Sequence, residues 1–496
     1  MKHLRLFLRR ALLGVLAACV IASPASAISD VPEDFWAKGD IERCVALKYF
    51  YLESDGTFGA GKEMSRAEFL VVLCRLFGWK ATAAAREVYE DVPKKAWYAG
   101  AVETAYHHGA ITSQDGTFRP DDPITRSEAA AMLVRGLGYG SIAGLIQDMP
   151  LPFRDVRANS GYIIMAYGLG LMDGTSVTEF SPEGHVTREQ AAVILMRLHD
   201  KLHDDTTSRT GIATGPAGLP DLTGYEAVGV AAARLTYNGE PQLTTLLDRE
   251  ETAATQKAVR AAGAKALLYV TGGVYHFREN DAEKLAAVLL QAVKDRGYDG
   301  LFLDISGLTS VTQRNELTAA ARLLREGLGE DRLLYAAAEA PSGKGSFFGY
   351  DYAALGEIAD RLVLRVSPQE EAGDLVAPLE PPEQLYYALN RLRGVVDGGK
   401  LTLLLTSTGY EWDGEAARAV TAQDLTEYLA EQGARSHYSG RYACAYLPRG
   451  GENTTVWYLN GQSIQERVQL ARLFGGGNLC LSDLNHALPE VLEAMP

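Results

Sequence analysis

Apolar residues in the first two hundred positions recur at helical spacing, and the recurrence has three copies. In each copy a Ser or Thr is followed three residues later by Glu or Gln, which forms a capping box that begins a helix. The capping positions are Ser65, Thr125 and Thr187. Apolar side chains then follow three and four residues apart, as one buried helical face requires. Because a helix-like stretch and a turn precede each box, we predict helix–loop–helix units, each too small to bury its apolar face alone.

The second half of the chain changes to short apolar strands that alternate with longer helices. Residues 201–222, rich in Thr, Gly and Pro, predict a linker. Beyond them, strands are expected at 227–233, 266–270, 300–305, 333–338, 362–366, 401–405 and 478–481, and helices at 282–295, 311–326, 382–392, 422–431 and 463–474. This alternation predicts an α/β fold, a (β/α)8 TIM-like barrel over residues 223–496, with a small insert at 442–458. Chemistry in such a barrel lies at the C-terminal ends of the strands.

Other short motifs mark the three copies. Asp-Gly-Thr turns occur at residues 55–57, 115–117 and 173–175, and each supports a tight reversal of the chain. An arginine follows every capping residue, at Arg66, Arg126 and Arg188. Asp-Val-Pro segments near the start of the first two copies lead to Trp36 and Trp97, whereas the corresponding position of the third copy falls near Gly161.

Charge and the N-terminal segment narrow the classes of function. The formal net charge is −15, and residues 1–27 hold four positive charges and no acid, so their removal leaves −19. Without a later Lys/Arg cluster, the chain is a poor binder of nucleic acid. The basic start, short apolar stretch and Ala25-Ser26-Ala27 exit predict an export signal. No other stretch reaches the roughly 18 apolar residues of a transmembrane helix.

The cysteines leave one alternative open within the export signal. Residues 16–19 are similar to a bacterial lipoprotein box, which would leave Cys19 lipidated. The apolar run continues beyond Cys19, however, and favours cleavage after Ala27. The remaining cysteines show no paired spacing and no histidine at ligand spacing, so we expect buried free thiols, no metal and no cofactor at Cys44, Cys74, Cys444 and Cys480.

The combined motifs of the repeats resemble the S-layer homology (SLH) domain, in copies at residues 29–80, 88–140 and 150–200. The resemblance implies an all-α assembly of three repeats that binds a pyruvylated secondary polysaccharide of a bacterial cell wall. It also implies that Trp36 with Arg66, and Trp97 with Arg126, line the binding pockets. An arginine at a helix N-terminus suits a carboxylate, and an indole offers a flat face to a sugar.

Each of these residues also has a structural interpretation. The arginines are then solvated charges in the first turn of a helix, and the tryptophans are core anchors. In the third repeat the tryptophan is replaced near Gly161, and an insertion separates Gly174 from Phe180. The resemblance therefore implies a smaller contribution, or a structural role only, for Arg188.

The strand at residues 298–308 resembles the fourth strand of glycoside hydrolase family 18, in which an aspartate and a glutamate serve catalysis. Asp304 stands at the aspartate position, but Ser306 stands at the glutamate position. A serine hydroxyl cannot supply general-acid catalysis at neutral pH. The sixth-strand tyrosine and aspartate of the family are also replaced, within residues 364–368. Both losses favour a barrel that binds glycan with little or no hydrolysis.

Two other functions remain open. Glu339 directly follows the expected strand at 333–338, so with Asp304 it offers a carboxylate pair for an active hydrolase on polymers of N-acetylglucosamine, either peptidoglycan or chitin. A third possibility is a structural S-layer or envelope component. Further candidates at the barrel mouth are Tyr410 and Trp412, as stacking faces for a glycan, and Asp483.

Overall fold

The computed structural model describes residues 28–81, 87–112, 116–204, 207–273, 278–341, 349–366, 380–413, 417–431, 433–449 and 454–496. The described residues form two compact units, one of residues 28–138 with 179–197, the other of residues 139–178 with 198–496. The expected export signal and Cys19 lie outside the described residues, as do Asp115 and the replaced family positions at 367–368.

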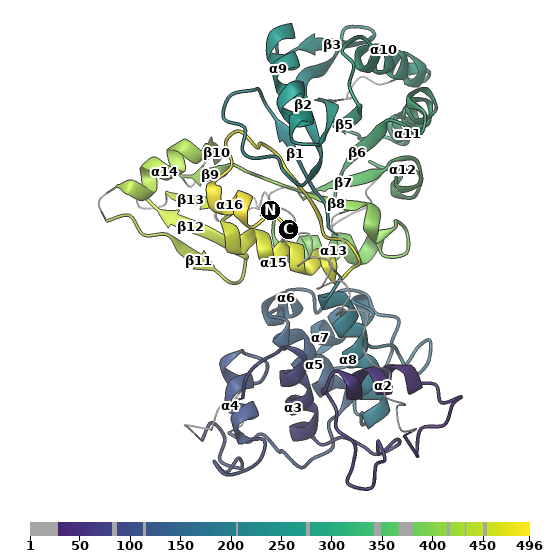
Figure 1. Ribbon diagram of the computed structural model, residues 1–496, viewed down its shortest axis with the longest axis vertical. Helices are drawn as coiled ribbons and strands as arrows, with labels where there is room; N and C mark the ends of the chain where they lie inside the picture. The colour runs from purple at the N-terminus through teal and green to yellow at the C-terminus, as the bar shows by residue number, and fades with distance from the viewer. Residues whose placement is uncertain are drawn as a thin grey trace, which may run out of the picture. The chain divides into compact units, whose positions relative to one another are not determined.

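The first unit is built from the capped helices and their loops (Figure 1). Complete capping boxes at Ser65 and Thr125 begin two of these helices. At Thr187 only half of the box forms, because the Gln190 side chain accepts from the Thr187 N–H while the Thr187 hydroxyl has no partner among the described residues. The helices are α2 (Lys38–Ala46), α3 (Arg66–Leu76), α4 (Ala99–His107), α5 (Arg126–Gly136) and the start of α8 (Arg188–Leu202).

The three repeats are joined by a closed ring of backbone hydrogen bonds. The Met64 N–H donates to the Val186 carbonyl at 2.9 Å, the Val186 N–H to Ile124 at 3.0 Å, and the Ile124 N–H to Met64 at 2.9 Å. All three side chains are fully buried. Isolated β-bridges accompany this ring, at Glu63–Thr187, Ser65–Pro123 and Thr125–His185. The repeat region is therefore helical with β-type joints rather than the all-α assembly expected.

The first half of the third repeat belongs to the second unit. Residues 139–178 of that unit contain α6 (Gly140–Leu145), which precedes the third repeat, and α7 (Ser160–Gly168), which lies within it. A Cβ on Gly161 would lie 1.7 Å from the Ala143 carbonyl oxygen, so only glycine permits α6 and α7 to approach this closely. The Tyr386 hydroxyl donates to the Ile164 carbonyl at 3.0 Å and fills the space beside Gly168. These contacts explain why no tryptophan stands near residue 161.

Eight parallel strands close into the expected barrel (Figure 1). Its order is β1-β2-β4-β5-β6-β7-β8-β14, with β14 returning to β1, and β3 (Pro241–Thr245) pairs antiparallel at the outer part of β2. The strands are β1 (Arg209–Ala213), β2 (Tyr225–Tyr237), β4 (Lys265–Gly273), β5 (Gly300–Ser306), β6 (Leu333–Glu339), β7 (Arg361–Arg365), β8 (Leu401–Leu405) and β14 (Asn478–Leu481). The barrel core includes Ile212, Phe302, Tyr335, Val363 and Cys480.

Helices follow most of the strands. They are α9 (Arg249–Ala261), α10 (Asp281–Asp295), α11 (Val311–Leu328), α12 (Tyr352–Ile358), α13 (Pro382–Leu392), α15 (Gly461–Arg472) and α16 (Pro489–Glu493). One sequence expectation was wrong: β1 lies inside residues 201–222, which were expected to be a linker. Its five residues carry too few apolar side chains to signal a strand, and parallel pairing on both edges stabilises it.

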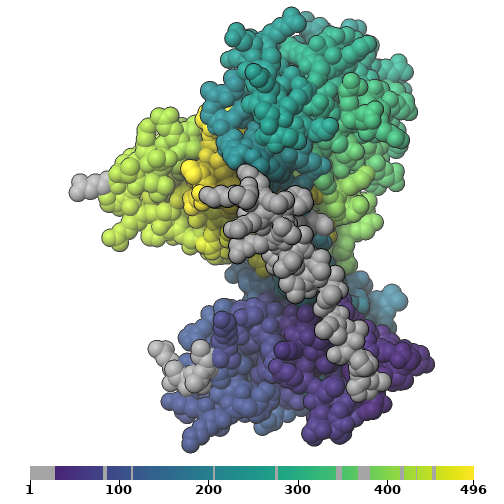
Figure 2. Space-filling view, in the orientation of Figure 1, coloured from purple at the N-terminus to yellow at the C-terminus, as the bar shows by residue number. Residues whose placement is uncertain are grey.

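The insert is larger than the expected 442–458. It comprises β9 (Gly409–Trp412), β10 (Ala417–Val420), α14 (Ala422–Ala430), β11 (His437–Ser439), β12 (Cys444–Pro448) and β13 (Thr455–Tyr458). The strands form an antiparallel sheet in the order β10-β9-β13-β12-β11. Figure 2 shows the insert as a light-green lobe beside the teal and green residues of the barrel.

The cysteines are confirmed as buried free thiols. The Cys44 thiol donates to the Ala192 carbonyl and the Cys74 thiol to the Ala101 carbonyl. Burial raises the pKa of both thiols to about 12, so they stay protonated and unreactive at neutral pH.

Candidate functional sites

The arginine after each capping residue reaches into the next repeat. Arg66 Nε donates to the Phe118 carbonyl, Arg126 Nε to Phe180, and Arg188 Nε to Phe58, each at 2.8 Å. Each guanidinium also lies over the ring of the same phenylalanine, at 5.1, 4.6 and 5.1 Å from the centroid. The third arginine therefore makes the same contact as the other two and joins the last repeat to the first.

These arginines are not solvated first-turn charges. Arg66 also pairs with Glu128 at 2.7 Å, and Arg188 donates a second hydrogen bond to the Tyr51 carbonyl at 3.2 Å. Arg126 is 8% exposed. Their partners lie 52 to 137 positions away in the sequence, so the arginines fasten repeat to repeat.

An aspartate from each Asp-Val-Pro segment holds the loop that the arginine contacts. Asp30 accepts from the N–H groups of Phe58, Gly59 and Ala60 at 2.7 to 2.9 Å. Burial opposes ionisation of Asp30, but these three donors outweigh it and lower the pKa of the carboxyl. Asp91 likewise accepts hydrogen bonds from the N–H groups of Phe118 and Arg119.

The two tryptophans are exposed and are not core anchors. Trp36 is 63% exposed and Trp97 66%. Each packs only loosely on its aromatic neighbour, Trp36 on Phe35 with centroids 6.2 Å apart and Trp97 on Tyr98 at 5.4 Å. The loop held by Asp30, in the repeat of Trp36, is contacted by Arg188, and the loop of the Trp97 repeat is contacted by Arg66. The arginine that reaches each loop thus comes from the preceding repeat around the ring.

At the carboxyl ends of the barrel strands, one arginine joins the two candidate carboxylates. Asp304 on β5 is 3% exposed and pairs with Arg365 of β7 at 3.0 Å. Its other oxygen accepts from the Tyr269 hydroxyl at 2.5 Å. The second terminal nitrogen of Arg365 lies 3.9 Å from Glu339, its direct register partner on β6. Asp304 and Glu339 are therefore brought together, as predicted, but around a cation that the sequence analysis did not single out.

Arg365 and two tyrosines complete the cluster. Burial disfavours a charged Arg365, yet the neighbouring Asp304, Tyr350, Glu339 and Tyr269 together outweigh burial and raise the pKa of the guanidinium. Burial and the neighbouring Asp304 carboxylate raise the pKa of Tyr269, so its hydroxyl remains a donor. Arg365 also donates to the Tyr350 hydroxyl at 3.3 Å. Ser306 donates to the Gly272 carbonyl at 3.2 Å and supplies no carboxyl group.

Comparison with known proteins assigns the repeats. The S-layer homology domain family matches residues 27–70, 88–130 and 152–192. The chain carries three SLH domains. It is 31% identical over 175 residues to an amylopullulanase of Thermoanaerobacterium thermosulfurigenes and 30% identical over 175 residues to the exoglucanase XynX of Acetivibrio thermocellus. Each match covers 34% of this chain, but only 9% and 16% of those proteins, respectively.

A surface layer protein of Brevibacillus choshinensis is 34% identical over 103 residues, covering 20% of this chain and 9% of that protein. The SLH domains and such relatives indicate a secreted protein of the bacterial cell surface. In the described part of the chain, no helix is both long and apolar enough to span a bilayer.

The barrel is similar in fold to chitinases. A chitinase from Chromobacterium violaceum matches with a TM-score of 0.50 and 19% identity, covering 58% of this chain and 98% of that one. A class V chitinase from Pseudomonas fluorescens Pf-5 matches with a TM-score of 0.50 and 17% identity over the same shares. At these identities the likeness establishes the barrel fold alone.

The remaining candidates lie apart from the carboxylate cluster. Tyr410 and Trp412 are on β9 of the insert, where alternation along the strand puts both on one face. Asp483 follows β14 and pairs with His486 at 2.7 Å. In the sequence, Arg365 and Tyr269 are visible only as polar residues on expected strands. That placement does not show which carboxylate each of them contacts.

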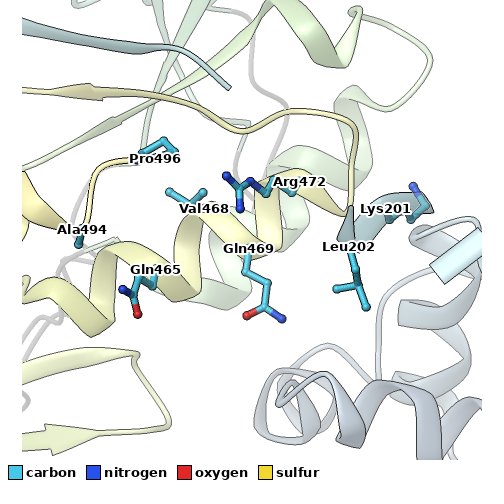
Figure 3. Close-up of a pocket in the computed structure, with 8 residues that line it drawn as sticks. All are labelled: Lys201, Leu202, Gln465, Val468, Gln469, Arg472, Ala494 and Pro496. Carbon is cyan, nitrogen blue, oxygen red and sulfur yellow. The ribbon is translucent and has the colours of Figure 1, made fainter. Parts of the chain in front are cut away.

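A cavity of about 310 Å³ lies on the second unit, away from the cluster (Figure 3). It is lined by Lys201 and Leu202 of α8, by Gln465, Val468, Gln469 and Arg472 of α15, and by Ala494 and Pro496. α15 leads into the amino end of β14, so the cavity lies toward the opposite end of the barrel from Asp304. None of the residues lining this cavity was predicted from the sequence for the cell-wall site or for the barrel mouth.

Proposed function

We propose that the protein is held at the bacterial cell wall by its three SLH domains, through the secondary wall polysaccharide, and presents a barrel that binds glycan with little or no hydrolysis. Exposed Trp36 and Trp97 support the first part, since indole faces in water have no packing role to fill. Arginine is suited to the carboxylate of a pyruvylated sugar. The loops that Asp30 and Asp91 hold, in the repeats of the two tryptophans, are each contacted by a guanidinium from the preceding repeat, which carries this chemistry.

The observation that carries the second part is the contact between Arg365 and Asp304. Glycoside hydrolysis needs a carboxylic acid that gives its proton to the leaving oxygen. Ser306 cannot do this, and Asp304 is already engaged: its Oδ1 forms an ion pair with Arg365 but accepts no hydrogen bond, and its Oδ2 accepts from the Tyr269 hydroxyl. The most buried carboxylate at the mouth is thus paired with a cation and hydrogen-bonded to a tyrosine.

The rival hydrolase reading rests on Glu339. Its side chain is 37% exposed, so a substrate can reach it. Its only neighbour of opposite charge in the described cluster is Arg365, at 3.9 Å, which is a loose contact. A structural role in the envelope has no such specific observation in its favour.

The full chain tests the proposal. We expect it to sediment with purified cell walls of its host and to lose this binding when the secondary polymer is stripped from them. We also expect it to be retained on insoluble chitin or peptidoglycan while releasing no reducing ends. Equal binding to stripped walls would refute anchoring, and robust release of reducing ends would establish the hydrolase instead.

A further inference from the structure

The first helix of the third SLH domain differs from its counterpart in the first domain. Six of the nine residues of α7 are buried, and Ile163, Met165 and Ala166 are fully so. α2 also has nine residues, but only Ile41 and Cys44 among them are buried. A helix that is apolar on all sides is buried on all sides. α7 must therefore pack against a partner that α2 lacks.

This partner is α13 of the barrel. The Tyr386 hydroxyl, on α13, donates to the Ile164 carbonyl of α7 at 3.0 Å, and the Tyr386 side chain is fully buried. Arg393, which directly follows α13, donates to the Tyr167 carbonyl at 3.2 Å. Its guanidinium also lies 5.5 Å from the centre of the Tyr167 ring. Side chains of the barrel thus bond to the backbone of an SLH helix at two successive points.

A glycine in α7 makes room for these side chains. A Cβ on Gly168 would lie 2.2 Å from the Tyr386 hydroxyl oxygen and 2.7 Å from Asn390 Oδ1, so the contact tolerates no side chain at this position. Gly144, a helical glycine of α6 in the same unit, would place its Cβ more than 4 Å from any neighbouring atom. The close fit is therefore specific to the face of α7 that meets α13.

The second helix of the third SLH domain also ends on the barrel. The last residues of α8, from Leu198 on, belong to the second unit. Lys201 Nζ donates at 2.6 Å to the carbonyl of Leu473, the C-terminal cap of α15. A cation suits this end of a helix, where carbonyl groups lack partners within the helix. The Tyr386 ring lies 5.6 Å from that of Phe474, beside this cap, so the contacts of α7 and α8 adjoin.

We propose that the third SLH domain has a second function beyond anchoring, as the docking element of the barrel. α7 and the end of α8 form a packed joint with α13 and α15, in the part of the chain where the sequence predicts a linker. The surface of α13 fits an SLH helix of this kind because it combines a buried hydroxyl donor, a guanidinium and space beside a glycine. A change on either side of the joint is then felt on the other.

Hydrogen exchange of the full chain in its native state, measured by mass spectrometry, tests the joint from both sides. Gly168→Ala, in the SLH domain, should speed exchange in α13 at least about fivefold, because the new methyl group collides with two α13 side chains. Tyr386→Phe, in the barrel, should speed exchange in α7 roughly threefold to tenfold, as loss of one buried hydrogen bond predicts. Gly144→Ala is the matched control and should leave exchange in α13 within about twofold.

The outcomes decide whether the third domain and the barrel are coupled. Acceleration in α13 by Gly168→Ala and in α7 by Tyr386→Phe supports the joint, whereas unchanged exchange in both helices refutes it. Should Gly168→Ala fail to fold, Tyr386→Phe decides together with Arg393→Ala, which removes an exposed side chain and should also speed exchange in α7. Sedimentation with cell walls is measured separately, so a failure of the proposed anchoring leaves this result standing.

Discussion

Arg188 Nε donates a 2.8 Å hydrogen bond to the carbonyl oxygen of Phe58, a residue 130 positions earlier in the chain. The contact repeats those of Arg66 with Phe118 and Arg126 with Phe180, and it closes the three repeats into a ring. The third repeat, which lacks the tryptophan of the other two, is therefore a full member of the ring through its arginine. Its role in the fold and its role in ligand binding are separable.

We expect Arg188→Ala to destabilise the SLH region about as much as Arg66→Ala, by about 1–3 kcal/mol, because each leaves a carbonyl without its charged donor. Urea unfolding of the full chain, followed by fluorescence of the tryptophans in the first two repeats, measures this. Arg188→Lys retains the charge but not the Nε–H, so it should recover only part of the loss. Unchanged unfolding in Arg188→Ala would show that the ring does not depend on this contact.

Trp36→Ala and Trp97→Ala together should weaken co-sedimentation with cell walls by at least tenfold and leave the unfolding midpoint within about 2 °C. The reason is their exposure, which gives them little part in packing but a free face for a sugar. The control is Val177→Ala, which truncates another exposed apolar side chain, 87% exposed. Equal wall binding by the double variant and the control would remove the tryptophans from the binding site.

Replacing Ser306 by Glu should restore at most a trace of glycan hydrolysis. The new carboxyl group supplies an acid, but Arg365 still pairs with one oxygen of Asp304 and Tyr269 still donates to the other. Reducing-end release from chito-oligosaccharides measures the outcome, with Glu339→Gln as the matched variant. Strong activity in the unaltered chain that disappears in Glu339→Gln would make Glu339 the acid and overturn the binder interpretation.

Glu380 should make the second unit more stable in mild acid than at neutral pH. Burial raises the pKa of this carboxyl to about 7, against the partial compensation of Arg467 and of the Thr406 N–H. The folded chain then holds a proton that the unfolded chain releases, so the free energy of unfolding falls as pH rises from about 4.5 to about 7. The expected decrease is on the order of 3 kcal/mol.

Denaturant unfolding of the unaltered chain and of Glu380→Gln between pH 4.5 and 8 checks this. Glutamine keeps an oxygen for the Thr406 N–H but does not titrate, so the slope across that window should become smaller. The change in slope is the diagnostic quantity, since the absolute stability of Glu380→Gln also reflects the buried Arg467. An identical slope in both chains would assign the pH dependence to other groups.

Local chemistry was enough to predict much of the fold from the sequence. Ser65 with Glu68 and Thr125 with Glu128 form the predicted caps, because a capping box involves residues only three positions apart. The alternation of apolar strands and helices predicted the barrel, since that pattern depends on burial within each element. The position of Asp304 and Ser306 at a strand end followed from the same pattern.

What only the tertiary structure decided depends on residues far apart in the chain. No local pattern shows that Arg365 lies between Asp304 and Glu339, because three different strands must be placed before these charges meet. β1 was missed because its five residues are stabilised by neighbouring strands rather than by their own pattern. The sequence by itself determined which elements form and which residue types they carry. Packing between distant elements determined which of those residues touch, because contact energies depend on spatial rather than sequence distance.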